Sequence, residues 1–134
     1  MNVRIETNET CKKLFETAAV LLRGGKLDDA IAIFDYLLIQ DPSVPEYWTS
    51  GGIARMKRGH LQEACAQFQV AEAADENNPV PVMLRGICFL KMGKQMEALI
   101  ALRRALCCAL QAPENQWIAD VIRRHIDRCG QPRA

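Results

Sequence analysis

The sequence lacks an excess of charge of either sign, and it lacks a long apolar run. Its 17 Lys and Arg nearly balance its 16 Asp and Glu, which gives a formal net charge of +1. Since nucleic-acid-binding domains usually carry a strong basic field, we expect no nucleic-acid partner. No apolar run reaches the roughly 18 residues that a membrane helix needs. Residues 1–9 are polar and contain no signal-peptide core, so we expect a cytoplasmic protein with no membrane partner.

The six cysteines lack the spacing of a metal site or of a redox pair. They occupy positions 11, 65, 88, 107, 108 and 129, and none forms a Cys-x-x-Cys motif. Neither His60 nor His125 completes a zinc-binding spacing. Cys65 and Cys88 fall within apolar helix faces, where a free thiol behaves as a small hydrophobic side chain. We therefore expect reduced cysteines with a packing role, no metal and no cofactor, with a redox role as the alternative.

What the sequence does contain is a repeat with a period of 34 residues. Each copy has a glycine, an alanine five residues later and a bulky side chain four residues after that, and a proline keeps the same step. These positions are Gly25, Gly59 and Gly93; Ala30, Ala64 and Ala98; Phe34, Phe68 and Leu102; and Pro45, Pro79 and Pro113. A period of 34 residues with this spacing is typical of the tetratricopeptide repeat (TPR).

The resemblance to TPR proteins implies an all-α fold: a right-handed superhelix of three TPR helix pairs followed by a C-terminal capping helix. We expect one domain over residues 10–129, with repeats at about 11–44, 45–78 and 79–112 and the capping helix at about 113–129. Residues 1–9 and 130–134 are expected to be flexible. A solenoid end needs a half-polar helix to cover its last repeat. The final helix is therefore interpreted as a cap, with a partner-binding helix as the alternative.

Capping and helix-breaking residues predict where the helices begin and end. The first five repeat helices are expected at about residues 8–23, 27–39, 45–59, 61–74 and 79–93. The sixth is expected to run from residue 93 to about residue 110. Asn8 is the expected N-cap of the first helix, and Asn78 that of the fifth. Ser43 and Glu46 have the spacing of a capping box at the third. Small residues where the paired helices cross, such as Gly52 and Gly86, are expected to allow close approach.

The first helix of each pair carries more apolar surface than the pair requires. One stripe packs on the second helix of the pair, and another lies about 100° away around the helix axis. By resemblance to TPR proteins, this second stripe lines the concave surface. Since large exposed apolar patches usually mark binding sites, we predict a groove for an extended apolar peptide. The alternative is that these side chains pack on one another or on the N-terminal segment.

The predicted groove has a floor and a charged rim. The rim cations are expected to favour an acidic flank of the bound peptide. The floor residues are Phe15, Ala19, Leu22, Thr49, Ile53, Met56, Met83, Ile87 and Leu90, and the rim residues are Lys12, Arg23, Lys57 and Lys91.

Between Leu14 and Ala109 the sequence resembles the TPR chaperones of bacterial type III secretion, which guard translocator subunits before export. The shared segments are Gly-Lys-Leu-Asp-Asp-Ala at 25–30, Phe-Asp-Tyr-Leu at 34–37, residues 75–79, and residues 87–93 with Ala98 following. The resemblance implies a cytoplasmic chaperone that masks an extended apolar segment of a secreted translocator subunit. It also implies that this segment is anchored on the groove residues named above, Thr49 excepted. Another secreted client, such as the needle protein, and a homodimer stay open.

Functions of other classes are the remaining alternatives. A general TPR scaffold would join two folded proteins through the convex surface or the final helix. An enzyme is not expected, because the sequence shows no phosphate-binding loop and no metal spacing. His60 also falls in a turn and His125 on the final helix, while Asp28, Asp29 and Glu63 fall on solvent faces.

Overall fold

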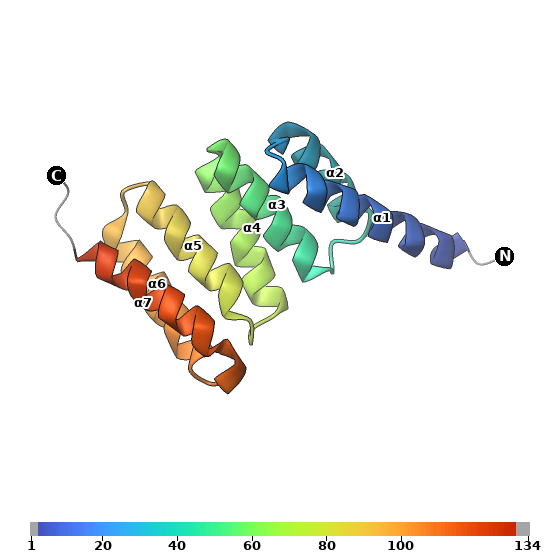
Figure 1. Cartoon of the computed structure of the whole chain (residues 1–134). Coiled ribbons are helices and arrows are strands. Elements are labelled where there is room, and N and C mark those ends of the chain that lie inside the picture. The colour runs from blue at the N-terminus through green and yellow to red at the C-terminus, as the bar shows by residue number, and fades with distance from the viewer. Residues whose placement is uncertain (1–2, 131–134) are drawn as a thin grey trace.

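Helices make up nearly all of the described part of the chain, residues 3–130, in this computed structural model (Figure 1). The all-α fold class is confirmed within that range. The elements are α1 (Val3–Arg23), α2 (Leu27–Gln40), α3 (Pro45–Arg58), α4 (Leu61–Ala74), α5 (Pro79–Lys91), α6 (Gln95–Ala109), the short 3₁₀ helix η1 (Pro113–Asn115) and α7 (Gln116–Cys129).

The helices form three antiparallel pairs that stack in chain order. Each helix from α1 to α7 packs against the next one, and α1 also touches α3, α3 touches α5, and α5 touches α7. Contacts of that extent are absent among α2, α4 and α6 within the described residues. We call α1, α3, α5 and α7 the A row. Because only these helices approach their equivalents in the next repeat, the A row lies on the inner side of the stack.

Three glycines with left-handed backbone close the turns within the pairs. Gly25, Gly59 and Gly93 have φ of +78°, +94° and +78°, and they follow one another at the 34-residue step. A side chain at such a φ clashes with its own backbone, so glycine is the residue that ends the first helix of each pair at this point.

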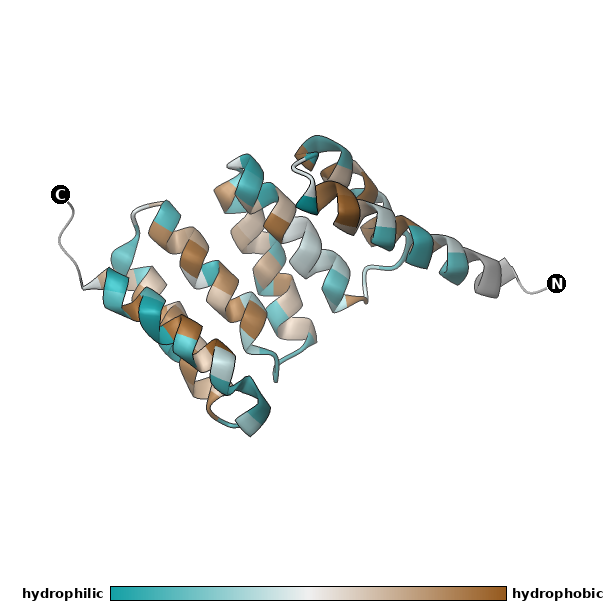
Figure 2. Ribbon diagram, viewed as in Figure 1, coloured by the Kyte–Doolittle hydropathy of each residue, from teal (hydrophilic) through white to brown (hydrophobic). Residues whose placement is uncertain are grey.

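The core lies between the two helices of each pair and continues from one pair to the next. The bulky repeat residues Phe34, Phe68 and Leu102 are fully buried, as are the alanines four residues before them. At the crossings, a Cβ on Gly52 would lie 2.6 Å from the Phe68 ring, and one on Gly86 would lie 2.8 Å from Leu102 Cγ. The close approach predicted from the small residues is confirmed. Figure 2 shows hydrophobic residues along much of α5, which lies between α4 and α7.

Two of the three predicted N-caps are wrong. Helix α1 begins at Val3, inside the segment expected to be flexible, since no glycine or proline precedes Asn8 to interrupt a helix. Val44, not Ser43, is the N-cap residue of α3, and it makes no side-chain cap. The carboxylate of Asp41 accepts hydrogen bonds from the N–H and hydroxyl of Ser43 and so takes the group expected to cap. The cap at Asn78 is confirmed, because its Oδ1 accepts from Val80 N at 3.0 Å.

The remaining predictions on architecture concern the chain ends, the division into repeats and the handedness of the superhelix. Residues 1, 2 and 131–134, at the ends predicted to be flexible, lie outside the described residues. We propose the division into repeats at 11–44, 45–78 and 79–112 with a cap at 113–129, and the right-handed sense of the superhelix stays a prediction. Among the described helices, none is both long and apolar enough to cross a membrane.

Candidate peptide-binding groove

The nine predicted groove residues all lie on the A row and are all half-buried. They occupy three equivalent positions on each of α1, α3 and α5, one 34-residue step apart. Phe15 and Leu22 pack on the core around Phe34, whereas Ile53, Met56, Met83 and Ile87 pack on the core around Phe68 and Cys88. Met83 and Leu90 also touch the core beneath α7. The nine residues therefore form a strip along the stack, and the seven larger apolar side chains among them pack partly on the core and are partly exposed.

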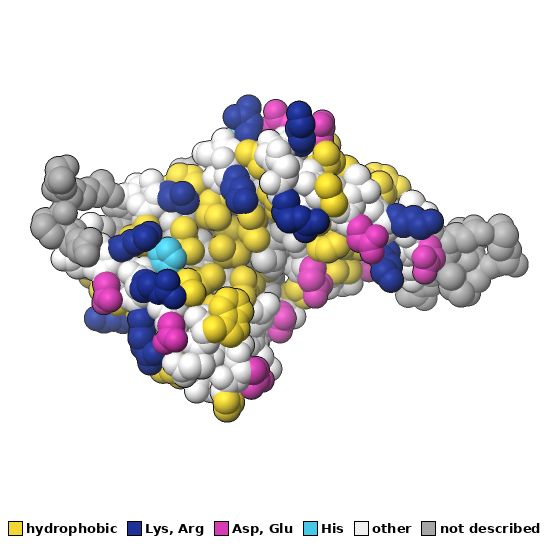
Figure 3. Space-filling view, in the orientation of Figure 1, with side chains coloured by type: hydrophobic (Ala, Val, Ile, Leu, Met, Phe, Trp, Pro, Cys, Tyr) yellow, Lys and Arg dark blue, Asp and Glu magenta, His cyan; other side chains and the backbone are white. Residues whose placement is uncertain are grey.

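Figure 3 views this face of the molecule directly. Hydrophobic side chains gather at its centre, around α5, and the surface is hollowed there. Lys and Arg side chains lie along the edge of that apolar area. The arrangement matches an apolar floor with a cationic border.

The four predicted rim residues are exposed, and none forms an ion pair with a described residue. Arg23 and Lys91 are the last residues of α1 and α5, and Lys57 is the last but one of α3. These three cations therefore line one edge of the strip at the helix C-termini, where the helix dipole favours positive charge. Lys12 lies apart from them, near the middle of α1.

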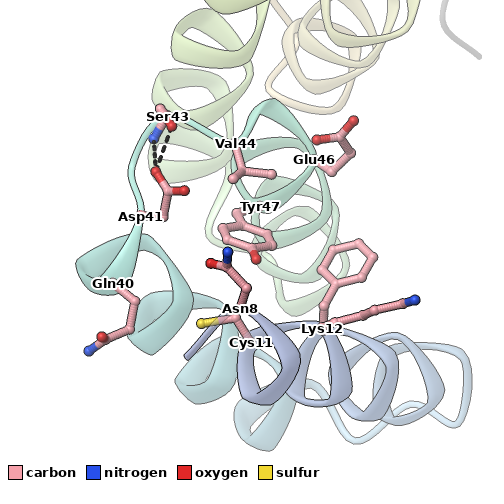
Figure 4. Close-up of a pocket in the computed structure, with 10 residues that line it drawn as sticks. Asn8, Cys11, Lys12, Gln40, Asp41, Ser43, Val44, Glu46 and Tyr47 are labelled. Carbon is pink, nitrogen blue, oxygen red and sulfur yellow. Dashed lines mark hydrogen bonds between the residues drawn. The ribbon is translucent and has the colours of Figure 1, made fainter. Parts of the chain in front are cut away.

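A pocket of about 770 Å³ opens at the N-terminal end of the strip, between α1 and the loop that leads into α3 (Figure 4). Phe15 and Tyr47 line it, with ring centroids 5.6 Å apart and planes tilted by 38°. Phe15 also meets the buried Phe34 edge-on at 6.0 Å. Cys11 and Lys12 border the pocket from α1. The two rings contact each other and together form an aromatic wall of the pocket.

Tyr47 is an aromatic pocket residue that the sequence pattern misses. At the 34-residue step its equivalents are Lys13 and Pro81, so no stripe of apolar residues singles it out. The available signal is the pair of adjacent aromatic residues Tyr47 and Trp48. Tyr47 packs on the core around Phe34, and the indole N–H of Trp48 donates to the carbonyl of Pro42. Burial raises the pKa of Tyr47, and electrostatic interaction with Cys11, Asp41 and Glu46 raises it further. Its hydroxyl thus stays protonated and can donate a hydrogen bond to a peptide carbonyl.

The fold gathers few of the groups that bind metals, and among its thiols Cys65 and Cys88 lie beside each other. Within residues 3–130, no set of three or more His, Cys, Asp or Glu side chains is placed to hold a metal ion. All six cysteines are free thiols, and Cys11 and Cys88 are buried. Burial raises the pKa of Cys88 to about 12, with a further contribution from the neighbouring Cys65.

Comparison with known proteins relates the fold to a group of solved structures. No family model and no curated relative matches the chain. PcrH bound to the chaperone binding region of PopD superposes with a TM-score of 0.87 and 22% identity, over 91% of this chain and 92% of that one. A structure of PcrH from Pseudomonas aeruginosa gives 0.86 and 22%, over 92% and 93%. The type III secretion chaperone SycD from Yersinia enterocolitica, with a peptide of the translocator YopD, gives 0.85 and 21%, over 90% and 92%.

The chain has the fold of these translocator chaperones. At about one identical residue in five, the similarity defines the fold. The PcrH complex contains the chaperone binding region of PopD, and the SycD complex contains a peptide of the translocator YopD. For this chain, the assignment of the groove residues is based on the strip of half-buried side chains in its own structure.

Proposed function

We propose that this protein is a cytoplasmic chaperone of a type III secretion system. In this proposal the strip on α1, α3 and α5 holds an extended apolar segment of a secreted translocator subunit before export. The observation that supports it most is the continuous line of nine half-buried side chains on the inner face of a translocator-chaperone fold. The proposal assigns the protein no catalytic step.

The spacing of the A row suggests the form of the bound segment. Contacting helices pack with axes about 10 Å apart. A polyproline II chain advances about 3.1 Å per residue and presents every third side chain on the same side. One peptide residue in three therefore meets each successive helix of the row. We expect apolar anchors at positions i, i+3 and i+6, with the first or last of them in the pocket beside Phe15 and Tyr47.

Masking is what such a groove achieves physically. Each square ångström of apolar surface removed from water contributes roughly 25 cal/mol, so three seated anchors offset part of the cost of ordering the peptide. Without the chaperone, a client that exposes such anchors would aggregate with other copies of itself. Because one strip buries only a short segment, its affinity is modest enough for the client to be released for export.

The test is affinity capture from lysate of a bacterium with a type III secretion system, read by mass spectrometry. Wild type is compared with Leu22→Asp in the groove and with Val20→Asp. Val20 lies on the same helix and is 58% exposed. Circular dichroism checks that both variants fold. We expect wild type and Val20→Asp to recover a translocator subunit and Leu22→Asp to lose it.

Other results would redirect the assignment. Recovery of a needle subunit in the same pattern keeps the groove and changes the client. Recovery of the same folded protein by wild type and both variants would contradict the groove proposal and favour a scaffold that binds through the convex surface.

A further inference from the structure

The 34-residue step that places the groove residues continues into the last helix. Adding 34 to Met83, Ile87 and Leu90 gives Trp117, Val121 and Arg124, all of which lie on α7. No residue is inserted between the third repeat and this helix, and α7 touches α5 in the same way that α5 touches α3. Helix α7 is therefore the fourth member of the A row as well as the cap of the stack.

Apolar residues of α5 and α7 pack together at this end of the strip. Met83 and Leu90 pack on the same buried cluster as Ile118 and Ile122 of α7. The side of α7 that carries Ile118 and Ile122 is buried, whereas Val121 is half-buried and Trp117 is 65% exposed.

The two tryptophans of the chain differ in how they are used. The indole N–H of Trp48 donates to the carbonyl of Pro42 at 2.7 Å, whereas that of Trp117 has no partner among the described residues. A large, exposed aromatic side chain with a free donor is the type most often found at the centre of binding interfaces. No such residue is needed to cap a solenoid, since Ile118 and Ile122 already cover the core.

The charge at this end of the strip is positive. Arg124 replaces the apolar residue of the first three rows, and Arg128 follows it one turn later. Neither forms an ion pair with a described residue, whereas Arg123, the neighbour of Arg124, pairs with Asp120 at 3.2 Å. Burial lowers the pKa of His125, and Arg128 and Arg124 lower it further, as expected beside two unneutralised cations.

We propose that α7 forms a fourth row of the groove, which binds an acidic stretch that adjoins the apolar anchors of the client. Trp117 and Val121 pack on one more apolar side chain of the extended segment. Arg124 and Arg128 face carboxylates of Asp or Glu residues beside it. The proposal rests on the proposed function and adds to it the orientation of the bound segment, whose acidic end lies over α7.

The probe is a library of random 12-residue peptides displayed on phage, selected on four full-length proteins. These are wild type, Trp117→Ala, Arg124→Ala and Arg123→Ala. The last two remove one positive charge each from adjacent residues, which makes Arg123→Ala the matched control. Both arginines and Trp117 are exposed, so all variants are expected to fold, and circular dichroism checks this.

Wild type and Arg123→Ala should enrich peptides with apolar residues three apart and with Asp or Glu at one end. Arg124→Ala should lose the acidic enrichment and bind the wild-type peptides about two- to fivefold more weakly. Trp117→Ala should lose the anchor next to the acidic end and bind about tenfold more weakly. If all four proteins select the same apolar peptides without acidic bias, the fourth row is wrong and the groove stands. If wild type selects no peptide, the groove itself is wrong.

Fluorescence of Trp48→Phe, in which Trp117 is the sole tryptophan, gives an independent readout. A selected peptide should shift its emission to the blue as the indole leaves water. The emission could instead shift with protein concentration when no peptide is present. If sedimentation then shows dimers that Trp117→Ala abolishes, this surface binds a second copy of the chain and the proposal is overturned. An emission unchanged by a bound peptide would overturn it too.

Discussion

A methyl group added at Gly52 would meet the ring of Phe68 at 2.6 Å, well inside van der Waals contact. The ring is fully buried and touches neighbours on all sides, so it has no free space to move into. At the scale of single residues, the packing of each repeat thus depends on a few positions where only glycine or alanine fits.

Gly52→Ala should therefore destabilise the protein by about 1–3 kcal/mol, the usual cost of overpacking a core. The gain in helix propensity from glycine to alanine, about 1 kcal/mol, offsets only part of this. Urea denaturation followed by circular dichroism measures the change. Gly24→Ala is the control, because its Cβ would meet no atom closer than 3.4 Å and should alter stability by less than about 0.5 kcal/mol. Equal stabilities for the two variants would contradict the crossing geometry.

The cysteines should differ in reactivity according to their surroundings. Thiolates react and thiols do not, so Cys88, which is buried and has a pKa raised to about 12, should resist iodoacetamide at pH 8. Cys107, which is exposed, should be alkylated first. Peptide mass spectrometry against time gives the order, and labelling of Cys88 should begin only when the chain is unfolded in urea. Cys88 modified as fast as Cys107 in the folded protein would show that α5 is not packed as described.

At the scale of the helices, the sequence predicts most boundaries because glycine and proline recur at one period. It does not predict those boundaries that depend on competition between local polar groups. Ser43 binds Asp41 instead of capping α3, and the 34-residue pattern carries no information about that choice. Arg55 stands at a position where the other two repeats have the apolar residues Leu21 and Phe89. The structure shows why it is tolerated, since it forms two hydrogen bonds with Asp35 of α2, at 2.8 and 2.9 Å.

The same limit applies to the candidate site. The strip on α1, α3 and α5 follows from helical periodicity, which is why all nine residues predicted from it lie on one face. Tyr47 and the extension over α7 do not follow, because they depend on which helices touch across repeats. That information is in the packing, where α1 meets the loop before α3 and where α5 meets α7.

Helix α7 should contribute to stability through one face and leave stability unaffected on the other. Ile122 is fully buried against the third repeat, so Ile122→Ala should cost about 2–5 kcal/mol. Trp117→Ala, five residues away on the same helix and largely exposed, should change stability by less than about 0.5 kcal/mol. Thermal unfolding of both variants beside wild type makes the comparison. A large loss for Trp117→Ala would mean that the indole belongs to the fold and not to the groove.

At the scale of the whole molecule, one fold presents two different surfaces. The A row offers a strip whose larger apolar side chains pack partly on the core and are partly exposed. The second helices of the pairs carry scattered exposed apolar residues, such as Met96 and Ile100 on α6. Since only the A row brings its residues together across repeats, a change on this face should affect binding in a way that the same change on α6 does not.

The most direct test of the chaperone proposal uses this contrast. A translocator subunit is coexpressed with wild type, Ile87→Asp or Ile100→Asp, and the fraction of the translocator in the soluble phase is measured. Ile87 is a half-buried groove residue, and Ile100 is 60% exposed on α6. With all three proteins folded by circular dichroism, we predict a soluble translocator with wild type and Ile100→Asp and an insoluble one with Ile87→Asp. Equal solubility with the two variants would contradict the account.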